Sequence, residues 1–240
     1  MDLRAAVLER TWRSPLTWSW APTEQAKWSL AVATSLRGSP TTGTWNQSGP
    51  SHRYDPTLPD RLFFTDSDEA NALIASDAMA LLVGFALDQQ VTVQKAFAGP
   101  LVLRERLGAL DADTLASADL EPVFRARPAI HRFPGSMAKR VHELAVHVRD
   151  HYDGDAARVW TEASDSDELR ANLAALPGFG EMKVKALGSV LAKPFGVDAA
   201  QELVPWHPTL GDVDSPEALA DYQAAKRAHK AEWSKARPPG

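Results

Sequence analysis

The chain of 240 residues contains no cysteine, which excludes disulfide bonds, thiolate nucleophiles and cysteine-ligated zinc or iron–sulfur clusters. It has no apolar run near the roughly 18 residues that a membrane-spanning helix needs, and its first residues lack the apolar segment of a signal peptide. No stretch alternates apolar and polar residues as a half-buried strand would. These absences predict a cytoplasmic protein without a membrane partner.

Charge is distributed unevenly along the chain. A net charge of −5 argues against a protein that coats nucleic acid with its whole surface, yet two segments are basic. Residues 125–149 contain six basic residues and one acidic residue, and residues 226–237 contain five basic residues and one acidic residue. Each segment is either a solvated face or a surface that contacts phosphate groups.

Composition divides the chain into three parts. Residues 1–59 hold five of the eight tryptophans among many Ser, Thr, Pro and Gly residues and show no clear period, which predicts an irregular or disordered extension. Its tryptophans are compatible with a base-stacking platform, a loosely packed extension, or a segment that precedes the natural start of translation. Residues 60–211 form the predicted helical domain, and residues 212–240 a basic C-terminal helix that packs on it.

Helical periodicity begins near residue 60. Asp66 and Glu69 resemble a capping pair, and residues 78–85 are apolar on nearly every side, as in a helix at the centre of a core. A further helix is expected over residues 91–106, with a break or kink at Pro100 and its end at Gly108. Other expected helices cover residues 112–118, 119–126, 136–151, 155–162, 166–175 and 181–192, and one begins at Ser215-Pro216-Glu217. The predicted fold class is all-α.

The most informative segment is Leu176-Pro177-Gly178-Phe179-Gly180, which lies between two expected helices. Its two glycines permit a tight turn directly before a helix, where free backbone N–H groups converge. Such a point binds phosphate, so the segment is typical of a helix-hairpin-helix that holds the DNA backbone without reading its sequence.

Three blocks in order carry a resemblance to a known family: residues 81–90, residues 135–141 and the hairpin, residues 176–187. Over residues 62–198 the chain resembles the helix-hairpin-helix (HhH-GPD) superfamily of base-excision DNA glycosylases, which includes endonuclease III and the adenine and alkylation glycosylases. It looks especially like an actinobacterial-type branch of repair proteins. The resemblance implies a two-lobed helical fold, with the irregular extension before it.

The resemblance also implies a residue that fills the duplex when a damaged nucleotide rotates out. The matching residue is Gln90, with Gln89 beside it. An amide can donate to and accept from the orphaned base, which offsets part of the cost of unstacking. The alternative is that both glutamines only end a helix.

For the chemical step, the resemblance points to the carboxylate of Asp198 in Val197-Asp198, with Asp88 as the reserve. A carboxylate there stabilises the oxocarbenium-like sugar and orients water. Asp198 lies about two residues closer to the hairpin than in the family, and the alternative is a helix N-cap.

Met182 occupies the family's lyase position and Lys183 is turned by about 100°, so the expected enzyme is monofunctional, without lyase activity.

The expected DNA backbone contacts combine the hairpin with nearby basic side chains. They are Gly178, Phe179, Gly180, Lys183, Lys139 and Arg140. His147 and His151 have the spacing of a metal pair, but a third ligand is missing, so no metal and no cofactor are expected.

The resulting hypothesis is a monomeric DNA glycosylase of base excision repair, associated with the nucleoid when bound. Its partner is double-stranded DNA with a damaged base, and its reaction is hydrolysis of the N-glycosidic bond of the extruded nucleotide. One alternative is a non-catalytic DNA-binding or damage-sensing protein. Another is a helical domain that binds proteins.

Overall fold

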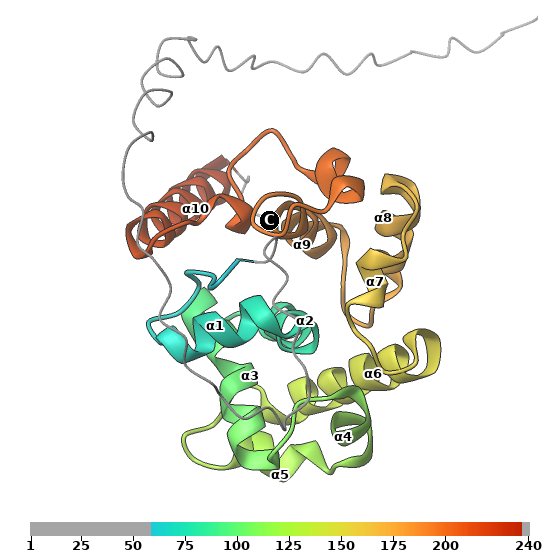
Figure 1. Cartoon of the computed structure of the whole chain (residues 1–240). Coiled ribbons are helices and arrows are strands. Elements are labelled where there is room, and N and C mark those ends of the chain that lie inside the picture. Colours follow the sequence, from blue (N-terminus) through green and yellow to red (C-terminus); the bar gives the residue numbers. More distant parts are fainter. Residues whose placement is uncertain (1–58, 237–240) are drawn as a thin grey trace, which may run out of the picture. The chain divides into compact units, whose positions relative to one another are not determined.

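The helices form two groups that differ in their packing partners (Figure 1). The structure, a computed structural model, describes residues 59–236 and the side chains of residues 59–227. The predicted extension lies outside these residues except for its last position. No strand occurs between residues 59 and 236, so the all-α prediction is confirmed for this part of the chain.

The first group holds the larger part of the core. Its helices are α1 (Asp68–Ser76), α2 (Ala78–Leu87), α3 (Val93–Leu107), α4 (Ala112–Ser117), α5 (Leu120–Arg125) and α6 (Pro134–Tyr152). Helix α2 packs against α1, α3 and α6, and nine of its ten residues are buried, as its apolar sequence predicts. Its Phe85 ring meets Phe97 of α3 edge-on, with the centroids 5.1 Å apart.

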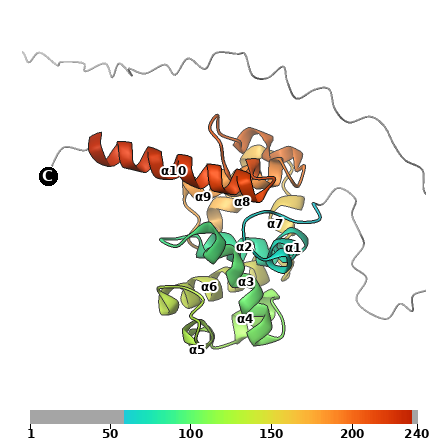
Figure 2. The same ribbon diagram turned by 90° about the vertical axis from the view of Figure 1, so that its left-hand side faces the viewer.

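The second group surrounds α9. It consists of α7 (Arg158–Thr161), α8 (Ser166–Ala175), α9 (Glu181–Ala192), α10 (Pro216–Ala236) and the 3-10 helices η1 (Asp198–Leu203) and η2 (Leu210–Asp212). Helix α9 packs against α8, η1 and η2, while α10 packs against η2. In the side view of Figure 2, α10 extends beyond the other helices. Contacts between α6 and α7 join the two groups.

One predicted cap is wrong, for a local reason. Helix α1 is capped by Ser67 and not by Asp66, because the Ser67 hydroxyl accepts the Ala70 N–H at 3.2 Å. Of the two alternatives predicted at Pro100, the break does not occur, because α3 continues through Pro100 to Leu107. It ends as predicted at Gly108, whose φ of 83° lies in the left-handed region.

No single helix among residues 59–236 is both long and apolar enough to cross a membrane, although α1 and α2, bent by 114°, would meet that test together. Most of the apolar residues in α1 and α2 are buried in the core.

Candidate functional site

The turn between α8 and α9 is held by its aromatic residue. Phe179 donates its N–H to the Leu176 carbonyl at 3.1 Å, and its ring is buried, with a 5% exposed fraction. Gly178 and Gly180 on either side are exposed. Gly178 has a φ of 81°, and a Cβ there would lie 2.8 Å from Cδ and Nη1 of Arg140. The hairpin therefore favours a glycine at Gly178 for its backbone conformation, and a Cβ there would also displace the end of the Arg140 side chain.

Helix α9 begins with unoccupied backbone donors. No side chain caps it, and the N–H groups of Gly180, Glu181 and Met182 meet no acceptor within the described part of the chain. The space around Gly180 is open, and Met182 beside it is 79% exposed. An anion could approach these donors and would also be favoured by the helix dipole.

A cavity of about 420 Å³ lies against this helix start. The end of α2, the hairpin with the first turns of α9, η2 and α10 all contribute to its walls. The lining residues are Phe85, Asp88, Gln89, Gly178, Gly180, Glu181, Met182, Lys183, Ala186, Leu210, Tyr222 and Lys226. The cavity thus joins the two helix groups, and segments far apart in the sequence meet in it.

Lys183 lies in the wall of this cavity and not on the outer surface. Its ammonium donates to the Ala86 carbonyl of α2 at 3.1 Å and lies 5.5 Å from the centroid of the Phe179 ring. Burial lowers the pKa of Lys183 to about 8, the nearby charge of Arg140 acts in the same direction, and Asp88 opposes both. A substantial fraction of this lysine is therefore a neutral amine near pH 8. The neighbouring Lys185 instead pairs with Glu181 on the surface, at 2.6 Å.

Asp88 lines the same cavity from the opposite helix group. It is the residue at which α2 ends, and its backbone N–H still bonds the Gly84 and Phe85 carbonyls. Burial raises the pKa of Asp88, and the positive charges of Lys226 and Lys183 offset part of that rise. A carboxyl group and an amine with opposite pKa shifts therefore share one cavity.

The two predicted wedge residues follow Asp88 in the segment between α2 and α3, called here the Gln segment (residues 88–92). Gln89 lines the cavity and is half-buried, whereas Gln90 is exposed. Gln90 has a φ of 55°, a left-handed conformation that residues other than glycine seldom adopt. The C-cap of α2 is Asp88, and the two glutamines follow it directly.

Asp198 and Lys139 lie outside this cavity. Asp198 is the exposed first residue of η1, and the N-cap position proposed for it as the alternative belongs to Val197. Lys139 is exposed and lies 3.7 Å from Glu143 on α6. The structure thus brings together the hairpin, Arg140, Lys183, Gln89 and Asp88, and it leaves Asp198 and Lys139 apart from them.

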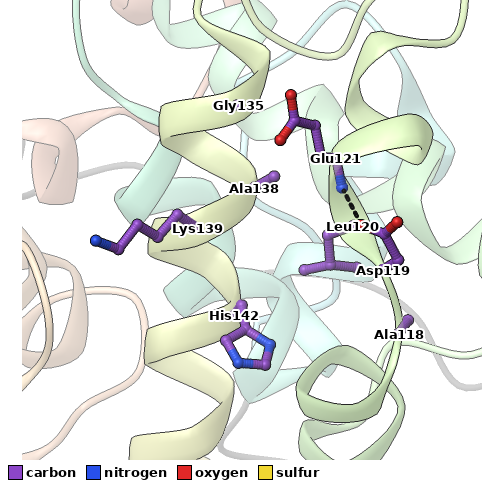
Figure 3. A pocket seen from close by; sticks show the side chains of 8 residues that line it. All are labelled: Ala118, Asp119, Leu120, Glu121, Gly135, Ala138, Lys139 and His142. Carbon is purple, nitrogen blue, oxygen red and sulfur yellow. Dashed lines mark hydrogen bonds between the residues drawn. The ribbon is translucent and has the colours of Figure 1, made fainter.

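Lys139 borders a second, shallower cavity of about 290 Å³ between α6 and the segment that leads into α5 (Figure 3). Ala138 and His142 of α6 face Asp119 and Glu121 across it, whereas the Lys139 side chain points to the other side of α6. We call this cavity the α5–α6 groove. Glu121 is exposed and pairs with Arg125 at 2.6 Å, so its charge is solvated and balanced.

Sequence reasoning missed two residues near the site, Tyr222 and His131, and it expected Lys183 at the DNA backbone and not in the cavity wall. For Lys183 a signal was present, because it follows the buried Phe179 by four residues and such pairs share a helix face. His131 carried no local signal. Its ring is buried and contacts the Gln segment 42 residues away.

Comparisons with known proteins add no assignment: no protein-family model matches the chain, and neither a curated protein nor a solved structure shows significant similarity to it. Among the described residues, no group of three or more His, Asp or Glu side chains could hold a metal ion. His147 and His151 stack on each other, with ring centroids 4.3 Å apart. The function must therefore be argued from the geometry alone.

Proposed function

We propose that the protein is a DNA glycosylase of the helix-hairpin-helix type that removes a damaged base from duplex DNA. One observation carries the proposal. The half-buried side chains of Asp88 and Lys183 line one cavity beside the uncapped start of α9. A phosphate bound at that helix start would place the adjoining nucleotide at the cavity mouth.

Asp88, in place of Asp198, is the proposed catalytic carboxylate. As the glycosidic bond breaks, positive charge develops on the sugar, and an ionised carboxylate in a poorly solvated cavity stabilises that charge strongly. Its raised pKa also makes Asp88 a better base toward the attacking water than an exposed aspartate. The exposed Asp198 has neither advantage.

The hairpin and its basic neighbours would hold the DNA backbone. The free N–H groups of Gly180, Glu181 and Met182 are suited to one phosphate, and Arg140 beside Gly178 to the same or an adjoining one. Gln90 would fill the space left by the extruded nucleotide, since its side chain is exposed beside the cavity.

The test is an assay of the full chain on duplexes that each contain one alkylated, deaminated or oxidised base. We expect abasic product from at least one duplex, with the undamaged duplex as control. The absence of product from every duplex, together with retained DNA binding, would favour the rival function of a non-catalytic DNA-binding or damage-sensing protein. The exposed position of Asp198 is the observation that supports this rival.

A second candidate activity is favoured by Lys183, although the sequence predicts a monofunctional enzyme. The neutral amine would attack C1′ of the aldehyde sugar left after base loss, and water would leave as the imine forms. Removal of a C2′ proton would then break the C3′–O bond, and hydrolysis of the imine would restore the lysine. Borohydride reduction of the imine on an abasic duplex would give a covalent protein–DNA product, and its absence would leave the hydrolytic reaction alone.

A further inference from the structure

His131 joins two segments that border the proposed site. Its ring is buried, with a 1% exposed fraction. On one side its Nε2 lies 3.0 Å from the Gln89 carbonyl oxygen in the Gln segment. On the other side its Nδ1 lies 3.1 Å from the backbone nitrogen of Phe133. We call residues 126–133, between α5 and α6, the Phe133 loop.

These contacts determine the protonation state of the ring. The backbone N–H of Phe133 can only donate, so Nδ1 must accept and carries no proton. Nε2 must then carry the proton, which it donates to the Gln89 carbonyl. The contacts observed here therefore require a neutral imidazole with its proton on Nε2.

The Phe133 loop is braced independently of His131. Arg106 of α3 donates to the carbonyls of Val123, Ala126 and Pro128, and Lys95 donates to the Ala129 carbonyl at 2.8 Å. At the end of this loop the Phe133 side chain is 40% exposed, and the Arg132 guanidinium lies 4.8 Å from its ring centroid. The loop thus presents an aromatic ring and a cation from a firmly held backbone.

Within the part of the chain that the structure describes, no side chain other than His131 donates to a backbone carbonyl of the Gln segment. Gln90 is exposed and has a left-handed backbone conformation. This conformation costs free energy, so it persists only where neighbouring contacts hold it. The bond from His131 to the preceding carbonyl is a constraint that connects it to the braced loop.

We propose that His131 is a positioning residue that fixes the Gln segment to the Phe133 loop, so that both meet a DNA duplex as one preorganised edge, and only while its ring is neutral. The role in DNA binding rests on the proposed function above. If both segments are fixed before binding, less conformational entropy is lost when the duplex binds.

Protonation would break the connection at a defined atom. A proton on Nδ1 would point at the Phe133 N–H, and two donors would face each other. The charged groups that face the ring are Lys95 of α3 and Arg132 of its own loop, and both oppose protonation. The Gln segment and the end of α2 present carbonyls, of Gln89 and Leu87, which favour it. Burial of the ring is the largest effect, and the net result is a lowered pKa of His131. The connection should therefore hold at neutral pH and fail in acid.

The first experiment tests the connection without DNA. In the full-length protein, long-range ¹H–¹⁵N NMR of the histidine rings at pH 7.5 should show His131 with Nε2 protonated and Nδ1 unprotonated. On acidification the amides of Gln89, Gln90 and Phe133 should shift together with the His131 ring, at a pH below 6.5. A proton on Nδ1 at pH 7.5, or a titration that leaves these amides unchanged, would overturn the proposal.

The second experiment measures the effect on a duplex. The duplex carries a tetrahydrofuran abasic analogue opposite 2-aminopurine, whose fluorescence reports intrusion into the base stack. We expect binding of the wild-type protein to raise the signal at pH 7.5, with a loss over the pH range in which His131 titrates. His131→Leu should bind about fivefold more weakly at pH 7.5, as expected for the loss of about one net hydrogen bond.

Two conservative variants separate positioning from general stability. His131→Asn can still accept the Phe133 N–H, and His131→Gln can still donate to the Gln89 carbonyl, but neither titrates. Each variant should retain part of the fluorescence increase but should no longer lose it on acidification. His207→Gln, which changes an exposed histidine, should still lose the increase on acidification. An acid step that persists in both His131 variants would refute the proposal.

If the wild type does not bind the duplex at all, the role in DNA binding fails together with the proposed function. If it binds and intrudes but removes no base, only the enzymatic function fails.

Discussion

The cavity beside α9 and the α5–α6 groove contain similar residue types but differ in how far those residues are removed from water. Each has carboxylates and a lysine in its lining. In the first, burial raises the pKa of Asp88 and lowers that of Lys183. In the second, Lys139 and Glu121 are exposed and pair with neighbours on their own helices. The comparison indicates that enclosure by distant helices, more than residue type, shifts the pKa values of ionisable side chains.

The largest expected effect separates the half-buried Asp88 from the exposed Asp198. Asp88→Asn should lower the rate of base excision by about 10²–10⁴-fold, the usual range for loss of a positioned acid or base. Asp198→Asn should change the rate by less than about threefold, because its carboxylate is in solvent and outside the cavity. Single-turnover rates on a cleavable lesion duplex would measure both. The opposite ranking would return the catalytic role to Asp198.

The next effect concerns the amine in the cavity. Borohydride trapping by the wild type should increase about tenfold per pH unit and level off above a pH of about 8, because only neutral Lys183 can attack. Lys183→Gln should abolish trapping, whereas Lys185→Gln, at a surface lysine paired with Glu181, should trap normally. Both variants are assayed on a duplex with a preformed abasic site. Equal trapping by Lys183→Gln and the wild type would exclude Lys183 as the nucleophile.

A smaller effect distinguishes the two hairpin glycines. Gly180 has ordinary φ and open space around it, so Gly180→Ala should keep the melting temperature but weaken duplex binding about tenfold, by crowding the free donors of α9. Gly178→Ala should instead destabilise the fold by about 1–2 kcal/mol, because a φ of 81° is strained for alanine. Thermal unfolding and fluorescence anisotropy would separate the two results.

The smallest effects are expected in the α5–α6 groove. Glu121→Gln removes an exposed ion pair with Arg125 and should change stability by less than about 1 kcal/mol. In Gly135→Ala the added Cβ would meet the flexible ends of Glu121, at 3.3 Å, and Arg125, at 3.5 Å, so the change should be tolerated. Neither variant should alter duplex binding by more than about twofold. A large loss of binding in either would show that this groove also belongs to the DNA surface.

Much of the local structure could be predicted because its causes are local. The bounds of α8 and α9, Ser166–Ala175 and Glu181–Ala192, agree with the predicted ranges. Asp165 caps the first of these helices, and the glycine-flanked turn separates them. The central burial of α2 also follows from its own composition, since a helix that is apolar on every side must be enclosed.

The site was less predictable because its contacts are long-range. Lys183 was expected near phosphate or solvent, but its amine bonds to a carbonyl 97 residues earlier in the chain. Asp88 was only the reserve carboxylate, and its burial depends on α9 and α10, which no local pattern places beside α2. His131 was not considered at all, although it contacts the predicted wedge segment.

The amino-acid sequence by itself therefore determined the helices, their caps and the hairpin turn, since these depend on apolar spacing, hydrogen-bonding side chains and glycine within a few residues. Only the tertiary structure decided which aspartate and which lysine are partly removed from solvent, namely Asp88 and Lys183. A pKa shift by burial is a property of the space around a group, and that space is enclosed here by helices that are distant in the chain.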